Sequence, residues 1–212
     1  MSAVDLDHLA LGPVRLVHGA LADQPVDVLV NTANTYLQMS SGVSGALRAA
    51  GGMEIHKEAV KHAPQPTGRI VLTGAGSLQA QGIYHAVLVD YTDGRGLSGK
   101  VITQVVEEVL ARMPEDGFGT VAFPLFGVAD RLGIEHGLAA MVEGLEAAGR
   151  EEDGGCPVDI VVRDAEDFAE ARRVAKSLKA GAGRRAEESQ LAEDYLAELM
   201  NSLGGDIDFD LG

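Results

Sequence analysis

The sequence is poor in cysteine and in aromatic residues: its 212 residues include one cysteine, Cys156, no tryptophan and only 4% aromatics. One cysteine cannot form an internal disulfide, which excludes the cross-linked framework of a small secreted protein. A chain of this length buries on the order of 70% of its unfolded surface, so it folds without disulfides or metals as supports. With 46% hydrophobic and 23% charged residues, we expect one ordinary globular domain in the cytoplasm.

Basic residues and long apolar runs are scarce as well. The chain carries 17 basic and 32 acidic residues, a formal net charge of −15, whereas nucleic-acid binders need clustered Lys and Arg to neutralise phosphates. No stretch approaches the roughly 18 to 20 apolar residues that cross a membrane. The first residues carry acids where a signal peptide carries Lys or Arg. These absences predict no nucleic-acid, membrane or export role.

Glycine, in contrast, is abundant, with 27 of 212 residues, when an average protein has about 7%. Many backbone positions therefore need unusual dihedral angles or close approach. The histidines and acids show no spacing typical of zinc ligands, so we expect no metal site and no cofactor.

Short apolar runs alternate with helical patterns between about residues 13 and 178. Strands separated by helices of roughly 10 to 15 residues imply crossover connections and a mixed, largely parallel sheet between layers of helices. The fold class is therefore α/β. We expect strands at 14–18, 26–30, 69–73, 83–89, 121–123 and 158–162, and helices at 44–50, 53–63, 97–113, 134–148 and 166–178.

The composition changes after Leu178, where a glycine-bearing linker precedes an amphipathic helical pattern at 187–203. The last residues, 206–211, alternate acidic and apolar side chains. We divide the chain into a domain of residues 1–179 and an acidic C-terminal extension of residues 180–212. We expect the apolar stripe of the helix at 187–203 to be covered by the domain's own surface, by a second copy of the chain or by a protein partner. Residues 204–212 form either a docking peptide or a solvated terminus.

The most informative segment joins a buried strand to a glycine loop and a helix. The strand at 26–30 runs into Asn31 and Asn34, and the loop carries Gly42 and Gly45 before the helix begins. Free amides and the partial positive charge at a helix N-terminus suit an anion such as phosphate. In the alternative interpretation, the two glycines merely turn the chain.

Read with its surroundings, this segment resembles the macrodomain, an ADP-ribose-binding, Appr-1''-p processing-like family. Residues 27–51 follow the family's first signature in order and spacing, a strand ending in two asparagines, a glycine loop and an Ala-rich helix. Residues 67–78, 82–87 and 121–127 resemble later landmarks in the same order. The resemblance implies a three-layer α/β/α fold with a central mixed, largely parallel sheet, and ADP-ribose as the ligand.

The resemblance also assigns residues to the ligand. It places the Asn34 side chain on the distal ribose and makes Asn31 and His85 structural. The remaining contacts fall at the adenine end, in the first loop and in the second loop. They are Ala20 and Leu21; Ser41, Gly42, Val43 and Ser44; and Gly127, Val128, Ala129, Asp130 and Arg131.

Both ligand loops and the adenine end depart from the family pattern. Ala20 stands where members carry an Asp that binds the adenine amino group, and Ser44 replaces the acid of hydrolytic members. Losing a general base costs on the order of 10² to 10⁴ in rate, which disfavours hydrolysis. Asp130 either faces the diphosphate or caps the next helix, and Arg131 either pairs with phosphate or lies on the surface. Asn34 and Asp130 stay as candidate catalytic residues.

Three functions are compatible with these residues. The first is a recognition module that binds ADP-ribose or a related nucleotide, free or attached to a protein. The alternative is an ADP-ribosyl hydrolase, acting on ADP-ribosylated protein or on ADP-ribose esters. The second alternative is a degenerate macrodomain with a closed pocket that acts in protein assembly.

Overall fold

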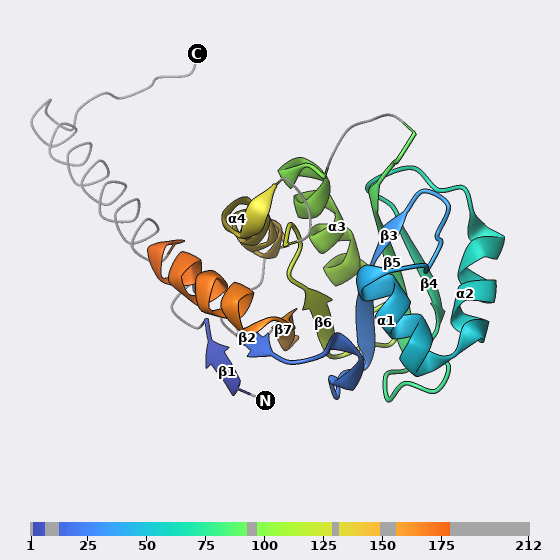
Figure 1. The fold of residues 1–212 in the computed structure, drawn as a ribbon, viewed down its shortest axis with the longest axis horizontal. Helices are drawn as coiled ribbons and strands as arrows, with labels where there is room; N and C mark the ends of the chain where they lie inside the picture. The colour runs from blue at the N-terminus through green and yellow to red at the C-terminus, as the bar shows by residue number, and fades with distance from the viewer. Residues whose placement is uncertain (1, 7–12, 93–96, 129–131, 149–155, 179–212) are drawn as a thin grey trace, which may run out of the picture.

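The computed structural model describes residues 2–6, 13–92, 97–128, 132–148 and 156–178, and the C-terminal extension lies outside them (Figure 1). Seven strands form one sheet in the order β1-β2-β7-β6-β3-β5-β4. The strands from β2 to β5 in this order are parallel to their neighbours, and β1 and β4 are antiparallel edge strands. Their bounds are Ser2–Asp5 (β1), Val14–His18 (β2), Val28–Asn34 (β3), Ile70–Gly74 (β4), Gly82–Val89 (β5), Val121–Pro124 (β6) and Val158–Val162 (β7).

Helices cover both faces of the sheet, which gives the expected three-layer α/β/α fold. One apolar core packs the sheet against α3, α4 and the last helix, with Ile102, Leu138 and Phe168 as members. A second core packs the other face against α1 and α2 through Leu47 and Ile55. The helices are α1 (Gly42–Gly51), α2 (Met53–Ala59), α3 (Gly99–Arg112), α4 (Gly133–Ala147) and a last helix that includes residues 165–178; two short 3-10 turns are η2 (Leu21–Asp23) and η3 (Val60–His62).

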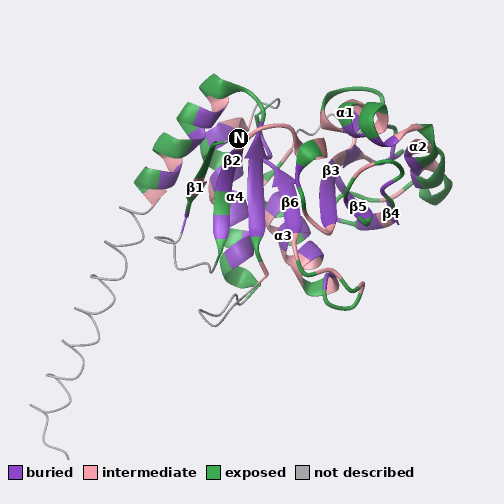
Figure 2. Cartoon of the chain, turned by 90° about the horizontal axis from the view of Figure 1, so that it is seen from below, coloured by how far each residue is buried: buried purple, intermediate pink, exposed green. Residues whose placement is uncertain are grey.

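Strand β3 shows how the sequence builds these layers. Successive side chains of a strand point to opposite faces, and Val28 and Val30 lie in one core while Leu29 lies in the other. A strand with helices on both sides is therefore buried along most of its length, as Figure 2 shows by the buried colour of the central strands. The short runs of Val, Ile and Leu in the sequence reflect this burial.

Two elements differ from the sequence-based expectation. Strand β3 was expected to end at residue 30, but it continues to Asn34, because Asn31 is fully buried and its polar side chain finds a partner inside the fold. Strand β1 was not expected at all. It has four largely exposed residues and no apolar alternation, and only its antiparallel pairing with β2 makes it a strand.

In the ranges that the structure describes, no helix is long and apolar enough to cross a bilayer.

Candidate functional site

A cavity of about 430 Å³ opens at the carboxyl ends of β3, β6 and β7, the edge where open α/β sheets generally bind ligands. Three of the expected ligand residues, Ala129, Asp130 and Arg131, lie outside the described part of the chain. The structure brings the other nine together around the cavity. These are Ala20, Leu21, Asn34, Ser41, Gly42, Val43, Ser44, Gly127 and Val128.

The N-terminus of α1 forms one wall of the cavity. Ser41 has an extended backbone and makes no capping hydrogen bond with its side chain. The first amide with a helical acceptor is that of Gly45, which donates to the carbonyl of Ser41 at 2.9 Å. Geometry leaves the amides of the first turn without intrahelical partners. Gly42 has a φ of +59°, in the left-handed region that glycine adopts without strain, so the loop can turn into the helix at this point.

Asn34 ends β3 at the mouth of the cavity. The strand bulges between Ala33 and Asn34, so that Asn34 pairs with Val89 of β5. Its side-chain Oδ1 accepts hydrogen bonds from the amides of Tyr36 (2.9 Å) and Gln38 (3.3 Å). Two backbone donors fix the orientation of the carboxamide and occupy its oxygen. The Nδ2 group is thus the part of Asn34 that is available to a ligand as a donor.

A buried polar network lies behind the first loop and joins β3, β4 and β5 to α1. The Nδ1 atom of His85 is 3.0 Å from Asn31 Nδ2, and Nε2 is 2.9 Å from Thr73 Oγ1. Thr73 donates to the carbonyl of Gly74, so its oxygen can accept the Nε2 proton. Burial lowers the pKa of His85 to about 4. His85 is therefore a neutral core histidine whose two ring nitrogens both have partners.

Ser44 connects this network to the cavity. Its Oγ lies 2.7 Å from the carbonyl oxygen of Thr32 and 2.9 Å from Asn31 Oδ1, and these two acceptors share the single hydroxyl proton. The residue is 6% exposed. In these contacts no base faces the hydroxyl, and position 44 offers no carboxylate that would take a proton from water. Ser44 fixes the first turn of α1 to the end of β3 rather than supplying acid or base chemistry.

The second loop follows β6 and presses against α4. Gly127 has a φ of +90°, and a Cβ atom there would lie 2.7 Å from the carbonyl oxygen of Gly133. A Cβ on Gly137 would lie only 2.0 Å from the carbonyl oxygen of Phe126. Such distances are too short for any side chain, so both positions require glycine. The close contact brings the N-terminal turn of α4 next to the loop that borders the cavity.

The opposite end of the cavity is formed by the segment after β2 and by the start of the last helix. Arg163, Asp164 and Asp167 line it together with Ala20. Asp164 Oδ1 accepts from the amides of Glu166 (2.8 Å) and Asp167 (3.3 Å), so this carboxylate caps the helix. Asp167 is the neighbouring carboxylate, and the structure shows no hydrogen bond from its side chain within the described residues.

Sequence reasoning missed several residues that line the cavity: Gln38, Tyr91, Leu97 and Asp167. Tyr91 follows β5, and the pairing of β5 with β3 brings it to the site. Asp167 belongs to the last helix, and the docking of that helix on the sheet brings it to the site. No local pattern marks Leu97.

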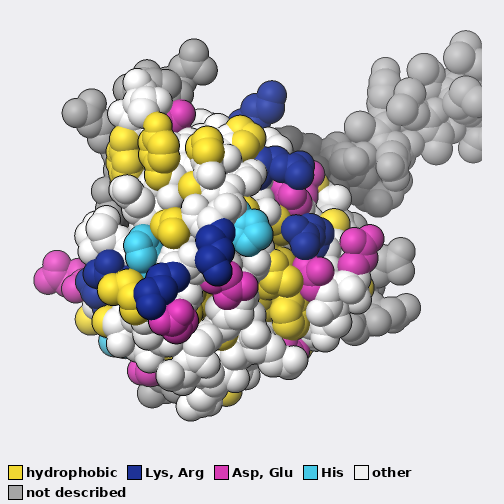
Figure 3. All heavy atoms as spheres, turned by 90° about the vertical axis from the view of Figure 1, so that its right-hand side faces the viewer, with side chains coloured by type: hydrophobic (Ala, Val, Ile, Leu, Met, Phe, Trp, Pro, Cys, Tyr) yellow, Lys and Arg dark blue, Asp and Glu magenta, His cyan; other side chains and the backbone are white. Residues whose placement is uncertain are grey.

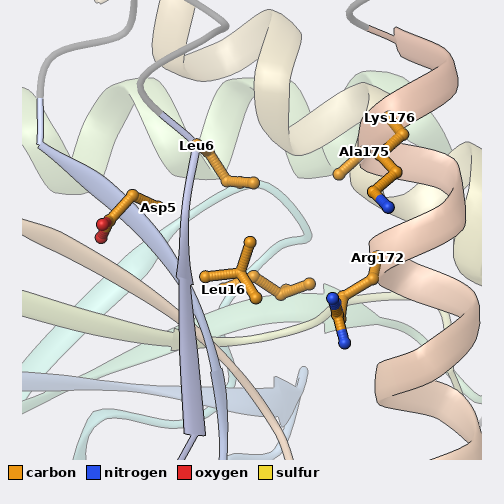
Figure 4. A pocket seen from close by; sticks show the side chains of 7 residues that line it. Asp5, Leu6, Leu16, Arg172, Ala175 and Lys176 are labelled. Atoms are coloured by element: carbon orange, nitrogen blue, oxygen red, sulfur yellow. The ribbon is translucent and has the colours of Figure 1, made fainter.

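Two other features lie away from this site. A smaller cavity of about 210 Å³ lies between β1, β2 and the last helix, where Leu6 and Leu16 face Arg172 and Lys176 (Figure 4). On the side of the molecule that carries α2, basic, acidic and histidine side chains are interspersed (Figure 3). Within the described ranges, no group of three or more His, Cys, Asp or Glu side chains is placed to hold a metal ion.

Comparison with known protein families finds a match in the central part of the chain. The family model described as "Macro domain" matches residues 30–132. A macro domain-containing protein of Caldanaerobacter subterraneus is 36% identical over 115 residues, which are 52% of this chain and 66% of that protein. An uncharacterized protein of Aquifex aeolicus is 33% identical over 54% of this chain and 68% of its own length. An O-acetyl-ADP-ribose deacetylase of Enterobacter cloacae is 33% identical over 52% of this chain and 64% of that enzyme.

Solved structures show the same architecture. A mutant of the Oceanobacillus iheyensis macrodomain with ADPR superimposes with a TM-score of 0.68 and 19% identity, covering 84% of this chain and 98% of that one. The Trypanosoma brucei macrodomain in complex with ADP-ribose gives a TM-score of 0.65 and 19% identity, over 76% of this chain and 68% of that one. At this identity the likeness demonstrates the fold.

Proposed function

The chain belongs to the macro domain family, and from this premise we propose that it binds ADP-ribose, free or attached to a protein, as a recognition module. The observation that carries the proposal is the uncapped N-terminus of α1 in the wall of the cavity. Free backbone amides and the helix dipole favour a bound phosphate group. The macrodomains of similar structure were solved with ADPR and with ADP-ribose.

The diphosphate fits between the two loops. On one side lie the amides of Gly42 and Val43, and on the other lie Gly127 and Val128. Arg163 is the one Lys or Arg among the described lining residues, so backbone groups must supply most of the donors. This arrangement suits a chain with a net charge of −15, because amides attract an anion locally without a basic surface.

With the diphosphate between the two loops, the positions of the distal ribose and of adenine follow. The distal ribose would lie beside Asn34, whose Nδ2 donates to a hydroxyl oxygen. Adenine would lie against Leu21 and Arg163, where a guanidinium can stack on an aromatic ring. Since Ala20 has no carboxylate and Asp164 caps a helix, Asp167 is the remaining side chain that can accept from the adenine amino group.

Hydrolysis is the second candidate, favoured by the similarity to an O-acetyl-ADP-ribose deacetylase. The surroundings of Ser44 support binding over hydrolysis, because the hydroxyl is already donated to Thr32 and Asn31 and no acid replaces it. A hydrolytic mechanism would need Asp130 or a water held by the substrate. The open cavity of about 430 Å³ disfavours the third candidate, a closed and degenerate pocket.

Calorimetric titration with ADP-ribose tests the proposal, with a matched pair of glycine variants. Gly42 and Gly52 both have positive φ and open space where a Cβ would stand, at opposite ends of α1. Alanine strains both positions, and Gly52 (φ +99°, ψ 169°) more than Gly42 (φ +59°), but only Gly42→Ala re-aims the amides in the cavity wall. We expect Gly42→Ala to weaken binding at least about tenfold and Gly52→Ala to leave it near that of the wild type.

Equal losses in the two variants would remove α1 from the binding site, and no binding by the wild-type protein would refute the proposal. Incubation with a mono-ADP-ribosylated protein then distinguishes binding from hydrolysis. Release of ADP-ribose over many turnovers would favour the hydrolase, whereas retention of the modified protein without release supports recognition.

A further inference from the structure

Large apolar side chains that remain exposed are concentrated at the mouth of the cavity. Among the described residues, four are exposed: Tyr36 (50%), Met53 (50%), Tyr91 (78%) and Val128 (37%). Tyr91 and Val128 line the cavity, and the amide of Tyr36 donates to Asn34. Only Met53, on α2, lies apart from the site. A cluster of exposed aromatic and aliphatic groups at the rim of a pocket typically marks a binding surface.

The pairing of two strands brings the chain segments that carry the two tyrosines to the same edge of the sheet. Asn34 of β3 pairs with Val89 of β5, and the amide of Thr35 donates to the carbonyl of Val89 at 3.1 Å. Tyr36 and Tyr91 each stand two residues beyond this pair, on neighbouring chain segments at the same edge of the sheet. That both segments lie at this edge is a consequence of the fold and not of a local motif.

The backbone on both sides is held in place although the rings are exposed. On the β3 side, Asn34 Oδ1 accepts the Tyr36 amide and the buried Leu37 adopts a φ of +55°. On the β5 side, Asp90 Oδ1 accepts from the amide and hydroxyl of Thr92 at 2.8 and 2.6 Å, which lowers the pKa of Asp90. Two fixed turns thus present the rings outward, so little backbone entropy is lost when they bind.

We propose that Tyr36, Tyr91 and Val128 form a docking surface for the protein segment that carries an ADP-ribosyl group, next to the cavity that holds the nucleotide. The proposal rests on the proposed function, because it places the point of attachment at the Asn34 end. Tyrosine supplies a large amphipathic contact at low entropic cost, as in other protein-binding surfaces. Bases also stack on tyrosine, but a chain with a net charge of −15 repels the backbone of a nucleic acid.

The test compares two ligands on the full-length chain. One is free ADP-ribose and the other is a short peptide that carries one ADP-ribosyl group, with the unmodified peptide as a blank. We expect the modified peptide to bind about tenfold more tightly than free ADP-ribose. Tyr36→Ala, whose side chain is not among the residues that line the cavity, should lose most of this advantage and still bind free ADP-ribose within about twofold. Met53→Ala, with the same exposed fraction as Tyr36, should change neither affinity.

The other outcomes overturn the inference in distinguishable ways. Equal affinity of the wild type for both ligands would show that the carrier is not contacted. Equal losses for both ligands in Tyr36→Ala would assign this tyrosine to the nucleotide itself. A modified oligonucleotide that binds more tightly than the peptide, with the same dependence on Tyr36, would identify a nucleic-acid carrier. No binding of either ligand by the wild type would instead refute the proposed function.

Discussion

The amino and carboxyl ends of the parallel strands, here called the amino edge and the carboxyl edge of the sheet, differ in how their hydrogen-bonding groups are used. At the amino edge, Asp27 precedes β3 and accepts from the amides of Gly119 and Thr120, the hydroxyl of Thr120 and the side chain of Gln81, at 2.7 to 3.0 Å. At the carboxyl edge, the first turn of α1 has no side-chain cap. One edge uses its polar groups to hold loops together, and at the other edge the first turn of α1 lacks a side-chain cap, as the proposed binding of ADP-ribose requires. Stability and binding can therefore be altered separately.

We expect the greatest change to be a loss of stability in mild acid. It would arise at His85, in the buried network behind the first loop. Burial holds the pKa of His85 near 4 in the fold, against about 6.5 in the unfolded chain. The unfolded chain thus takes up a proton first, and stability falls as the pH drops from about 6.5 to about 4, by on the order of 3 kcal/mol. Denaturant unfolding at several pH values measures this slope, which should be shallower in His85→Gln. An unchanged slope in the variant would assign the pH dependence to other groups.

Asp27→Ala should damage the amino edge alone. The change leaves several loop donors without an acceptor and should lower the free energy of unfolding by about 2 kcal/mol, with no change in the affinity for ADP-ribose. Hydrogen bonds from Gly119 and Thr120 lower the pKa of Asp27. The contribution of Asp27 to the free energy of unfolding is present above the ordinary pKa of aspartate and is lost as the pH falls below it. This loss occurs at a lower pH than the loss caused by His85. Asp23→Ala removes the same charge from an exposed site and serves as the control. Weaker ligand binding in Asp27→Ala would mean that the two edges are coupled.

One side chain, that of Asn34, both holds a turn through Oδ1 and offers Nδ2 to the proposed ligand. Asn34→Asp keeps an oxygen for the amides of Tyr36 and Gln38 but loses the Nδ2 donor, whereas Asn34→Ala loses both. Each should weaken ADP-ribose binding by about 1 to 3 kcal/mol. Only Asn34→Ala should also lower the melting temperature. Calorimetry and thermal unfolding of the pair separate the two roles, and equal affinity in the wild type and both variants would remove Asn34 from the ligand.

The smallest expected effect on binding is that of deleting residues 184–212. The last described residue that lines the cavity is Asp167, so the affinity for ADP-ribose should stay within about twofold. Self-association or capture of a protein partner should be lost, because the apolar stripe at Leu191, Leu196 and Leu199 needs a covering surface. Light scattering and titration test both halves, and a large loss of affinity would place the extension at the pocket.

Much of the fold could be predicted, because strands that are buried on both faces appear in the sequence as short runs of Val, Ile and Leu. Strands β2 and β7 were expected at their observed positions, and the helices differ from expectation mainly at their ends. The end of β3 was not predictable, since an asparagine normally signals a loop and only the partner at His85 allows Asn31 inside a strand. Strand β1 has no pattern of its own.

The candidate site likewise contains some residues that local sequence predicts and others that only the fold brings together. The first loop could be placed from local signals, namely glycines that precede an amphipathic helix. Tyr91 and Asp167 could not be placed, because strand pairing and helix docking bring them to the cavity. The use of Asn34 Oδ1 by its own turn also needs coordinates, since spacing alone suggests that the whole carboxamide faces the ligand.

The far end of α1 has a consequence for how the sequence can vary. The carbonyl oxygen of Gly51 accepts the amide of Ser77 at 2.9 Å, and a Cβ on Gly76 would lie 2.1 Å from that oxygen. The loop between β4 and β5 thus anchors the helix whose other end forms the cavity wall. A library of substitutions selected only for ADP-ribose binding should therefore reject almost every residue at position 76, which lies outside the cavity lining. Selection for ligand binding would then keep glycine at a position that does not itself line the cavity.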